Sequence, residues 1–124
     1  MRRPLAALLF TLSCIAAPAL AQDHQHPPQD VEAHEKFYSN WMRPDEPNLS
    51  CCSQRDCYST LARFRNGHWQ ALRREDGKWL KVPAAKIELN RDSPDGRNHL
   101  CAPPPENEAA YENGVICFIA GGGT

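Results

Sequence analysis

The chain has 124 residues, with 14 Lys and Arg against 15 Asp and Glu, and a formal net charge of −1 at pH 7. A chain of this length forms one small domain, and its near-neutral charge gives no general attraction to nucleic acid or to anionic membranes. These numbers exclude a nucleic-acid-binding protein of the strongly basic kind, so any charged binding site has to be local.

The N-terminus has the three zones of a secretory signal peptide. Two arginines follow Met1, residues 5–17 form an apolar run, and an Ala-Leu-Ala site ends at Ala21. The apolar run is shorter than the roughly 18 to 20 residues of a spanning helix, so a membrane-spanning protein is not expected. We predict that residues 1–21 are removed by cleavage after Ala21, which leaves a periplasmic or secreted protein.

Two regions follow the predicted cleavage site. Residues 22–29 are polar and contain two consecutive prolines, which predicts a flexible leader. Residues 30–124 are expected to form a single small Cys-rich domain. A core of this size is marginal, so covalent cross-links are important for its stability.

The first predicted element is an amphipathic helix over Val31–Met42, with Asp30 as its N-cap. Ala33, Phe37 and Trp41 recur at steps of four residues and therefore share one helix face. We interpret this aromatic stripe as core. Insertion of the stripe into a groove of a partner is the alternative.

Three strands are predicted next, over Tyr58–Arg65, His68–Arg74 and Lys78–Val82. They are separated by Asn66-Gly67 and Asp76-Gly77, the dipeptides that best supply the positive φ angles of tight hairpin turns. The pattern indicates an antiparallel β-meander.

The remaining segments complete the predicted fold. Residues 84–89 form either a helical turn or an extended piece, and Val115–Ala120 is a short apolar strand. The expected fold class is α+β, with an N-terminal amphipathic helix packed on a small antiparallel β-meander and with disulfides as stabilising cross-links.

Five cysteines remain in the predicted mature chain. They are Cys51, Cys52, Cys57, Cys101 and Cys117. In an oxidising compartment an odd number predicts two disulfides and one further thiol, and the neighbours Cys51 and Cys52 are not expected to bond each other. The sequence leaves many pairings open, of which we favour Cys101 with Cys117 and Cys57 with Cys51 or Cys52.

Metal binding is an alternative use of these side chains. An N-terminal copper site would need His24, which cleavage would place third, and we interpret His99 as a hydrogen-bonded residue rather than a ligand. Tetrahedral zinc accepts thiolates and imidazole, but oxidising conditions favour disulfides, so we expect neither metal nor cofactor. The zinc set would be Cys52, Cys57, His99 and either Cys101 or Cys117.

Basic residues are concentrated between Arg63 and Lys86. This stretch contains seven basic and two acidic residues, with two tryptophans among them. Arg63 and Arg65 share one face of a strand, so a basic aromatic surface could bind an anionic glycan, a lipid headgroup or an acidic protein. A solvated sheet face with tryptophan over the core is the competing interpretation. The candidate ligand-binding residues are Arg63, Arg65, Trp69, Arg73 and Trp79.

No catalytic motif is evident in the sequence. A nucleophile-elbow serine, a His-Glu-x-x-His helix and a Cys-x-x-Cys redox motif are all missing. We therefore predict a non-enzymatic, exported, disulfide-stabilised binding module. The alternatives are a metal-binding protein for zinc or copper, a thiol-redox protein, and a purely structural envelope protein.

The cysteine pattern also carries a resemblance. Ser50-Cys51-Cys52-x4-Cys57, then His99-Leu100-Cys101 and Cys117-Phe118-Ile119, resemble small exported Cys-rich proteins of Gram-negative bacteria with no assigned activity. The resemblance spans about Phe37 to Gly123. It implies a periplasmic, disulfide-bonded protein and transfers no catalytic residue.

Overall fold

The computed structural model describes residues 28–52 and 56–122. The predicted signal peptide, most of the leader and His24 lie outside the described residues. Within them, the single α-helix α1 spans Pro28–Lys36 and is followed by a 3₁₀ helix over Tyr38–Asn40. No helix in these two stretches is long and apolar enough to cross a membrane.

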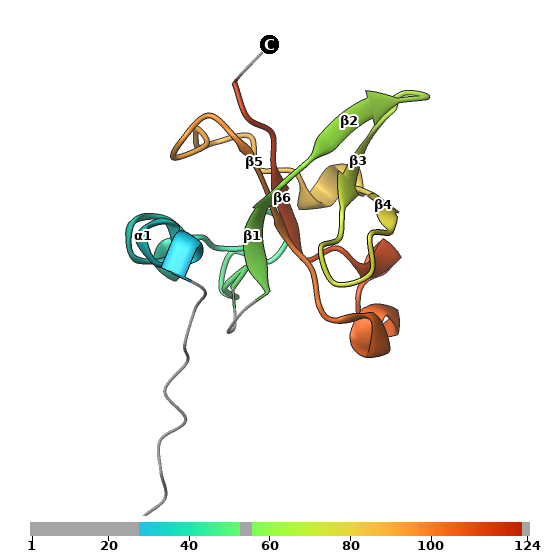
Figure 1. Cartoon of the computed structure of the whole chain (residues 1–124), viewed down its shortest axis with the longest axis horizontal. Helices are drawn as coiled ribbons and strands as arrows, with labels where there is room; N and C mark the ends of the chain where they lie inside the picture. Colours follow the sequence, from blue (N-terminus) through green and yellow to red (C-terminus); the bar gives the residue numbers. More distant parts are fainter. Residues whose placement is uncertain (1–27, 53–55, 123–124) are drawn as a thin grey trace, which may run out of the picture.

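Six short strands form two antiparallel sheets of three strands each (Figure 1). One sheet has the order β1-β5-β6, with β1 at Cys57–Thr60, β5 at Asn98–Cys101 and β6 at Cys117–Ile119. The other is a meander of β2 at Ala62–Arg65, β3 at His68–Leu72 and β4 at Trp79–Lys81. With α1 they make a disulfide-stabilised α+β fold.

The predicted strand Tyr58–Arg65 is divided between the two sheets at Leu61, where the chain turns from β1 into β2. The first turn of the meander follows the predicted turn chemistry, whereas at the second only Gly77 has a positive φ angle and Asp76 does not. Asn66 and Gly67 have φ angles of 52° and 78°, both in the left-handed region that a two-residue hairpin turn of this type requires. This turn fixes Arg65 opposite His68, and with it the register of the whole hairpin.

Alternation along β1, β5 and β6 gives the first sheet two different buried faces. Tyr58, Leu100 and Phe118 lie side by side on the face that packs against the meander. The other face carries the cysteines and packs against Phe37 and Trp41. The first sheet is therefore the middle layer of the fold.

The aromatic residues of the N-terminal segment are buried, as the interpretation as core requires. The expected helix over Val31–Met42 is not formed, however, because α1 ends at Lys36 and Phe37 and Trp41 follow it. These rings also pack on the cysteine face of the first sheet instead of on the meander, because Tyr58, Leu100 and Phe118 already fill the space between the two sheets.

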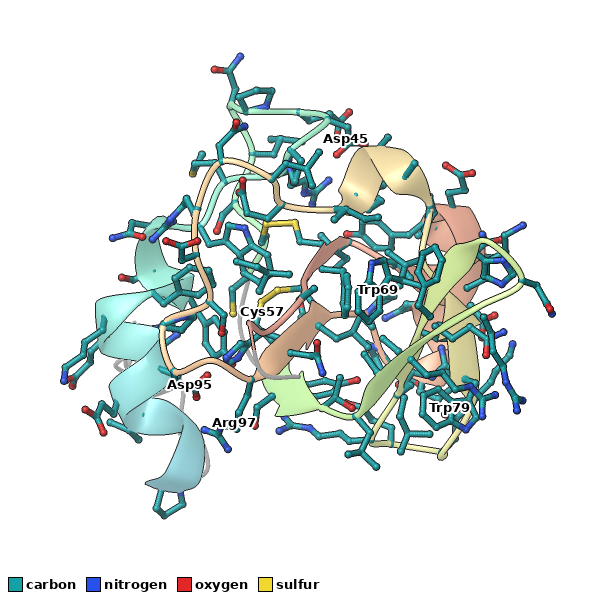
Figure 2. The ribbon with its side chains drawn as sticks, turned by 90° about the horizontal axis from the view of Figure 1, so that it is seen from above. Asp45, Cys57, Trp69, Trp79, Asp95 and Arg97 are labelled. Carbon is teal, nitrogen blue, oxygen red and sulfur yellow. A yellow bond between two sulfur atoms is a disulfide. The ribbon has the colours of Figure 1, made fainter. Side chains whose placement is uncertain are left out.

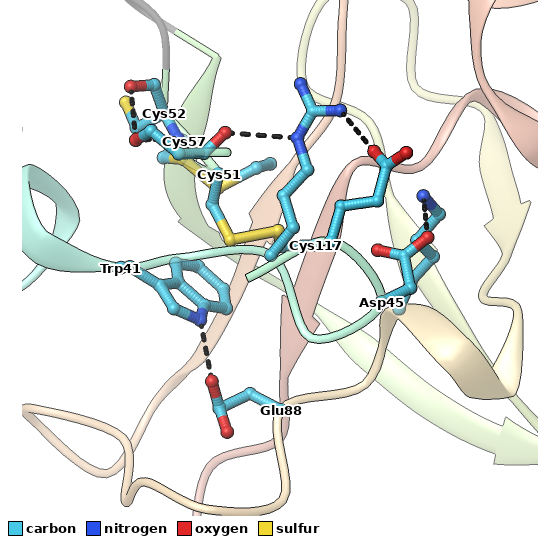
Figure 3. The surroundings of a disulfide bond; sticks show 12 residues. Trp41, Asp45, Cys51, Cys52, Cys57, Glu88 and Cys117 are labelled. Atoms are coloured by element: carbon cyan, nitrogen blue, oxygen red, sulfur yellow. Dashed lines mark hydrogen bonds and ion pairs between the residues drawn. A yellow bond between two sulfur atoms is a disulfide. The ribbon is translucent and has the colours of Figure 1, made fainter. Parts of the chain in front are cut away.

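Two disulfides join Cys51 to Cys117 (Figure 3) and Cys57 to Cys101. The expected number of bridges is confirmed, and Cys52 belongs to neither. Both favoured pairings, Cys101 with Cys117 and Cys57 with Cys51 or Cys52, are wrong, although Cys101 and Cys117 do lie opposite each other on β5 and β6. Cys101 is in the central strand and also lies opposite Cys57. Cys101 bonds Cys57, so Cys117 bonds Cys51 instead.

Peptide mapping without reduction is expected to find Cys57 joined to Cys101 and Cys51 joined to Cys117. Trypsin alone cannot test this, since the sequence has no Lys or Arg between Cys101 and Cys117. Adding a glutamate-specific protease separates them, because Glu106, Glu108 and Glu112 intervene, and trypsin cuts after Arg55 to separate Cys57 from Cys51. A peptide pair joining Cys101 to Cys117 would contradict the described bridges.

Residues 84–89, which the sequence predicted as either a helical turn or an extended piece, contain both. Ala84–Lys86 is a 3₁₀ helix, after which Ile87 forms a parallel bridge with Phe118 at the outer side of β6. The expected strand Val115–Ala120 is present as β6, and its three residues are all buried. Two further 3₁₀ helices, Pro105–Ala110 and Glu112–Gly114, lie between β5 and β6.

Candidate anion-binding face

One side of the meander gathers basic and polar side chains. Arg63 on β2 lies opposite Gln70 on β3, and Gln70 lies opposite Lys81 on β4, so the three side chains share a face. Residues two positions away point to the same side. We call this surface the basic face; its members are Arg63, Arg65, His68, Gln70, Trp79 and Lys81.

The Arg63 guanidinium is held in place on the basic face. Its central carbon lies 4.0 Å from the centre of the Trp79 ring, a cation–π contact, and its Nε donates a 2.7 Å hydrogen bond to Gln70 Oε1. Its two terminal nitrogens make no hydrogen bond with the described residues. They therefore form a fixed planar fork, the geometry that binds carboxylate, phosphate or sulfate oxygens in pairs.

The neighbours of Arg63 are themselves connected. His68 Nδ1 donates to the carbonyl oxygen of Asn66 at 3.2 Å, and the other ring nitrogen, Nε2, faces Gln70. Gln70 Nε2 lies 3.5 Å from that Nε2 and points its amide oxygen at Arg63. This chain of contacts orients the Gln70 amide, and through it the Arg63 fork.

The basic face lacks neutralising charge. Arg63, Arg65 and Lys81 form no ion pair with any carboxylate of the described residues. Other cations of the same stretch are paired, such as Lys78 with Glu108 at 2.7 Å. The uncompensated positive charge of this stretch is thus concentrated on one side of the meander.

Three of the five candidate residues from the sequence come together on this face, namely Arg63, Arg65 and Trp79. Trp69 is on the opposite face, where its ring lies 5.5 Å from that of Phe118 in the core. Figure 2 shows Trp69 toward the middle of the molecule and Trp79 toward its edge. The hairpin register explains why Trp69 lies on the opposite face, because it pairs Trp69 with Phe64 and not with Arg63 or Arg65.

The assignment of Arg73 to the binding surface is wrong, because its side chain is only 1% exposed. Its Nε and Nη2 donate to the two carboxylate oxygens of Asp76 at 2.9 and 2.6 Å, and Nη2 also donates to Glu108 at 2.9 Å. The hydrogen bond to Asp76 raises the pKa of Arg73 in spite of its burial, and the same contact lowers the pKa of Asp76 to about 2. Arg73 therefore ties the β3–β4 turn to the 3₁₀ helix Pro105–Ala110.

His68, Gln70 and Lys81 belong to the basic face but were not among the sequence candidates. The signal for His68 and Gln70 was available in the turn, because Asn66-Gly67 predicts a two-residue hairpin that pairs Arg65 with His68 and Arg63 with Gln70. Lys81 is placed by the pairing of β4 with β3.

A second polar cluster lies inside the molecule. His99 is completely buried, with its Nδ1 2.6 Å from Tyr38 Oη and its Nε2 2.8 Å from Asp95 Oδ1. Partial burial opposes ionisation of Asp95, but hydrogen bonds from His99 and Arg97 outweigh it and hold the pKa of Asp95 well below its usual range. The order hydroxyl, imidazole, carboxylate resembles a hydrolytic triad, yet Tyr38 and His99 are closed to a substrate, so we assign the cluster a structural role.

The zinc alternative does not fit this arrangement. Both nitrogens of His99 are engaged, and disulfides occupy the sulfurs of Cys57, Cys101 and Cys117. Among residues 28–52 and 56–122, no group of three His, Cys, Asp or Glu side chains is placed to hold a metal ion.

No protein-family model, curated protein or solved structure matches this chain. The functional argument therefore rests on the geometry and charge of its own side chains.

Proposed function

We propose that this protein is an exported, non-enzymatic binding module whose basic face binds clustered oxyanion groups, the phosphates, sulfates or carboxylates of an anionic partner. The observation that carries the proposal is the Arg63 fork. It is fixed by Trp79 and Gln70, it has both terminal nitrogens available, and it has Arg65 and Lys81 on the same face.

Preorganisation is the reason to prefer binding over a merely solvated sheet face. A free arginine loses side-chain entropy when it engages an oxyanion, whereas Arg63 is already confined by one ring contact and one hydrogen bond. Arg65 and Lys81 add positive charge around the fork, which favours anions with several charged groups.

Export is supported by two independent features. The first 21 residues have the pattern of a signal peptide, and two buried disulfides are typical of proteins that fold in oxidising compartments. A periplasmic location would also agree with the resemblance to exported Cys-rich proteins of Gram-negative bacteria. Such a protein meets phosphate-bearing and carboxylate-bearing envelope polymers and lipids.

The test is retention on a heparin-like resin. The double variant Arg63→Gln with Arg65→Gln is expected to elute at clearly lower salt than the unmodified protein, since it loses the fork and two charges. Its melting temperature is expected to fall by no more than a few degrees, because Arg63 contributes one cation–π contact and one hydrogen bond and Arg65 is exposed.

The matched control is Lys36→Gln with Arg97→Gln, which removes two exposed charges outside the meander, one on α1 and one in the loop before β5. It is expected to elute close to the unmodified protein. If both double variants eluted at equally lowered salt, retention would depend on net charge alone. The basic face would then have no special role. Arg63→Lys, which keeps the charge and removes the fork, is expected to elute between the unmodified protein and the double variant.

A further inference from the structure

The hairpin that carries the basic face also exposes a large apolar side chain on its other side. Phe64 lies between Arg63 and Arg65 in β2, so alternation directs it to the opposite face, and it is 61% exposed. Its ring meets that of Trp69 edge to face, with 5.6 Å between the centroids. The hairpin projects from the body of the molecule (Figure 1).

Two adjoining cavities continue from Phe64 along the molecule, and their lining mixes apolar side chains with charged ones, Glu88, Arg91 and Asp92 among them. A cavity of about 410 Å³ is lined by Phe64, Trp69, Pro83 and Ile87, with Lys81 and Glu112 among its polar lining. A second cavity of about 330 Å³ shares Trp69 and Ile87 and extends to Leu89, which is 82% exposed. Exposed apolar side chains thus occur at both ends of one connected surface.

The cations of the basic face and the exposed Phe64 together restrict the kind of partner that can bind. A soluble anionic polymer would satisfy Arg63, Arg65 and Lys81 but would leave Phe64 in water. The surface of an anionic lipid bilayer supplies both phosphate oxygens for the cations and hydrocarbon for an apolar side chain. The charge of the basic face is complementary to such a surface, and a projecting hairpin can reach it without unfolding the core.

We propose that the oxyanions bound by the basic face are the headgroup phosphates of an anionic lipid bilayer, with Phe64 inserted at the boundary between headgroups and acyl chains. This rests on the proposed function, because it names the source of the anions that the same face binds. Arg63, Arg65 and Lys81 contact the headgroups, while Phe64 adds the apolar contact that a soluble anion cannot provide.

Sedimentation with lipid vesicles tests the proposal. The protein is expected to sediment with vesicles that contain phosphatidylglycerol and to stay in solution with vesicles of phosphatidylcholine alone. Phe64→Ser is expected to weaken the vesicle partition coefficient about tenfold or more, as loss of one buried aromatic side chain implies. Arg63→Gln with Arg65→Gln is expected to weaken it by at least as much, since each charge near an anionic surface contributes about fivefold.

Leu49→Ser is the matched control, because Leu49 is 46% exposed but lies in the loop before Cys51, away from the hairpin. It is expected to leave the vesicle partition unchanged. All variants share the same N-terminus, so any contribution from residues 1–21 cancels in the comparison. Leu89→Ser provides a second apolar variant at a more exposed position, in case Phe64→Ser lowers the melting temperature.

The heparin-like resin separates the two proposals. Retention of Phe64→Ser on the resin together with its loss from vesicles would support the bilayer as the partner. Sedimentation of Phe64→Ser and Leu89→Ser like the unmodified protein, or no sedimentation of the unmodified protein with anionic vesicles, would overturn the bilayer proposal and leave the basic face with a soluble polymer or an acidic protein. No retention of the unmodified protein on the resin would instead overturn the proposed function.

Discussion

Asp76→Asn combined with Glu108→Gln is expected to destabilise the fold strongly, because it leaves the buried Arg73 guanidinium without a counter-charge. Within residues 28–52 and 56–122, Arg73 Nη1 has no hydrogen-bond partner, so the cation depends on Nε and Nη2 for its compensation. Urea unfolding followed by tryptophan fluorescence measures the loss.

Arg73→Met is the control for this prediction. It removes the buried charge and leaves Asp76 and Glu108, which are about one-third exposed and can be hydrated. Arg73→Met is therefore expected to cost less than the double variant. If Arg73→Met were the more damaging of the two, the guanidinium would act through its packing and not through its ion pairs.

The same ion pairs predict how stability changes in acid. The pKa of Asp76 is lowered from 3.8 to about 2, so the folded protein binds its proton less readily than the unfolded chain. The stabilisation that the ionised Asp76 gives to the folded state is therefore fully present above about pH 4 and is lost as the pH falls through 2. Asp76→Asn is expected to flatten that part of the stability profile, which unfolding at a series of pH values would measure.

Loss of a single disulfide is the second large expected effect. Cys57→Ala with Cys101→Ala opens a bridge that spans 44 residues, and the chain-entropy estimate for such a loop is about 4 kcal/mol. Both members are replaced together so that no liberated thiol can exchange with Cys51–Cys117. Thermal and urea unfolding of the two proteins measure the difference in unfolding free energy.

Cys52→Ser is the matched control for the disulfide variant, because Cys52 belongs to neither bridge. It is expected to change the unfolding free energy by less than about 1 kcal/mol. A control variant as unstable as the double variant would indicate that sulfur packing near Cys51, and not the cross-link, stabilises this region.

The meander could be predicted because its information is local. Asn66 and Gly67 adopt the two positive φ angles that the sequence suggests, and this turn alone determines that Arg63 meets Gln70. The alternation that puts Arg63 and Arg65 on one side is equally a property of the strand.

The parts that could not be predicted depend on residues far apart in the chain. Arg73 was assigned to the surface because nothing near it in sequence shows that Glu108 folds back to meet it, 35 residues away. The cysteine pairing failed for a related reason, since Cys101 has a cysteine opposite it on both neighbouring strands. The four-residue spacing of Phe37 and Trp41 suggested a continuous helix, whereas tertiary packing sets their places after α1 has ended.

The row of cysteines across β1, β5 and β6 has a consequence for oxidative folding. Cys101 and Cys117 are much closer in sequence than Cys57 and Cys101, so closing the shorter loop in an unfolded chain is favoured by about 1 kcal/mol. An oxidant that acts before β1 joins β5 therefore traps a bridge that the finished fold excludes. Pairing of β1 with β5 before oxidation avoids this bridge, and thiol–disulfide exchange can correct it afterwards.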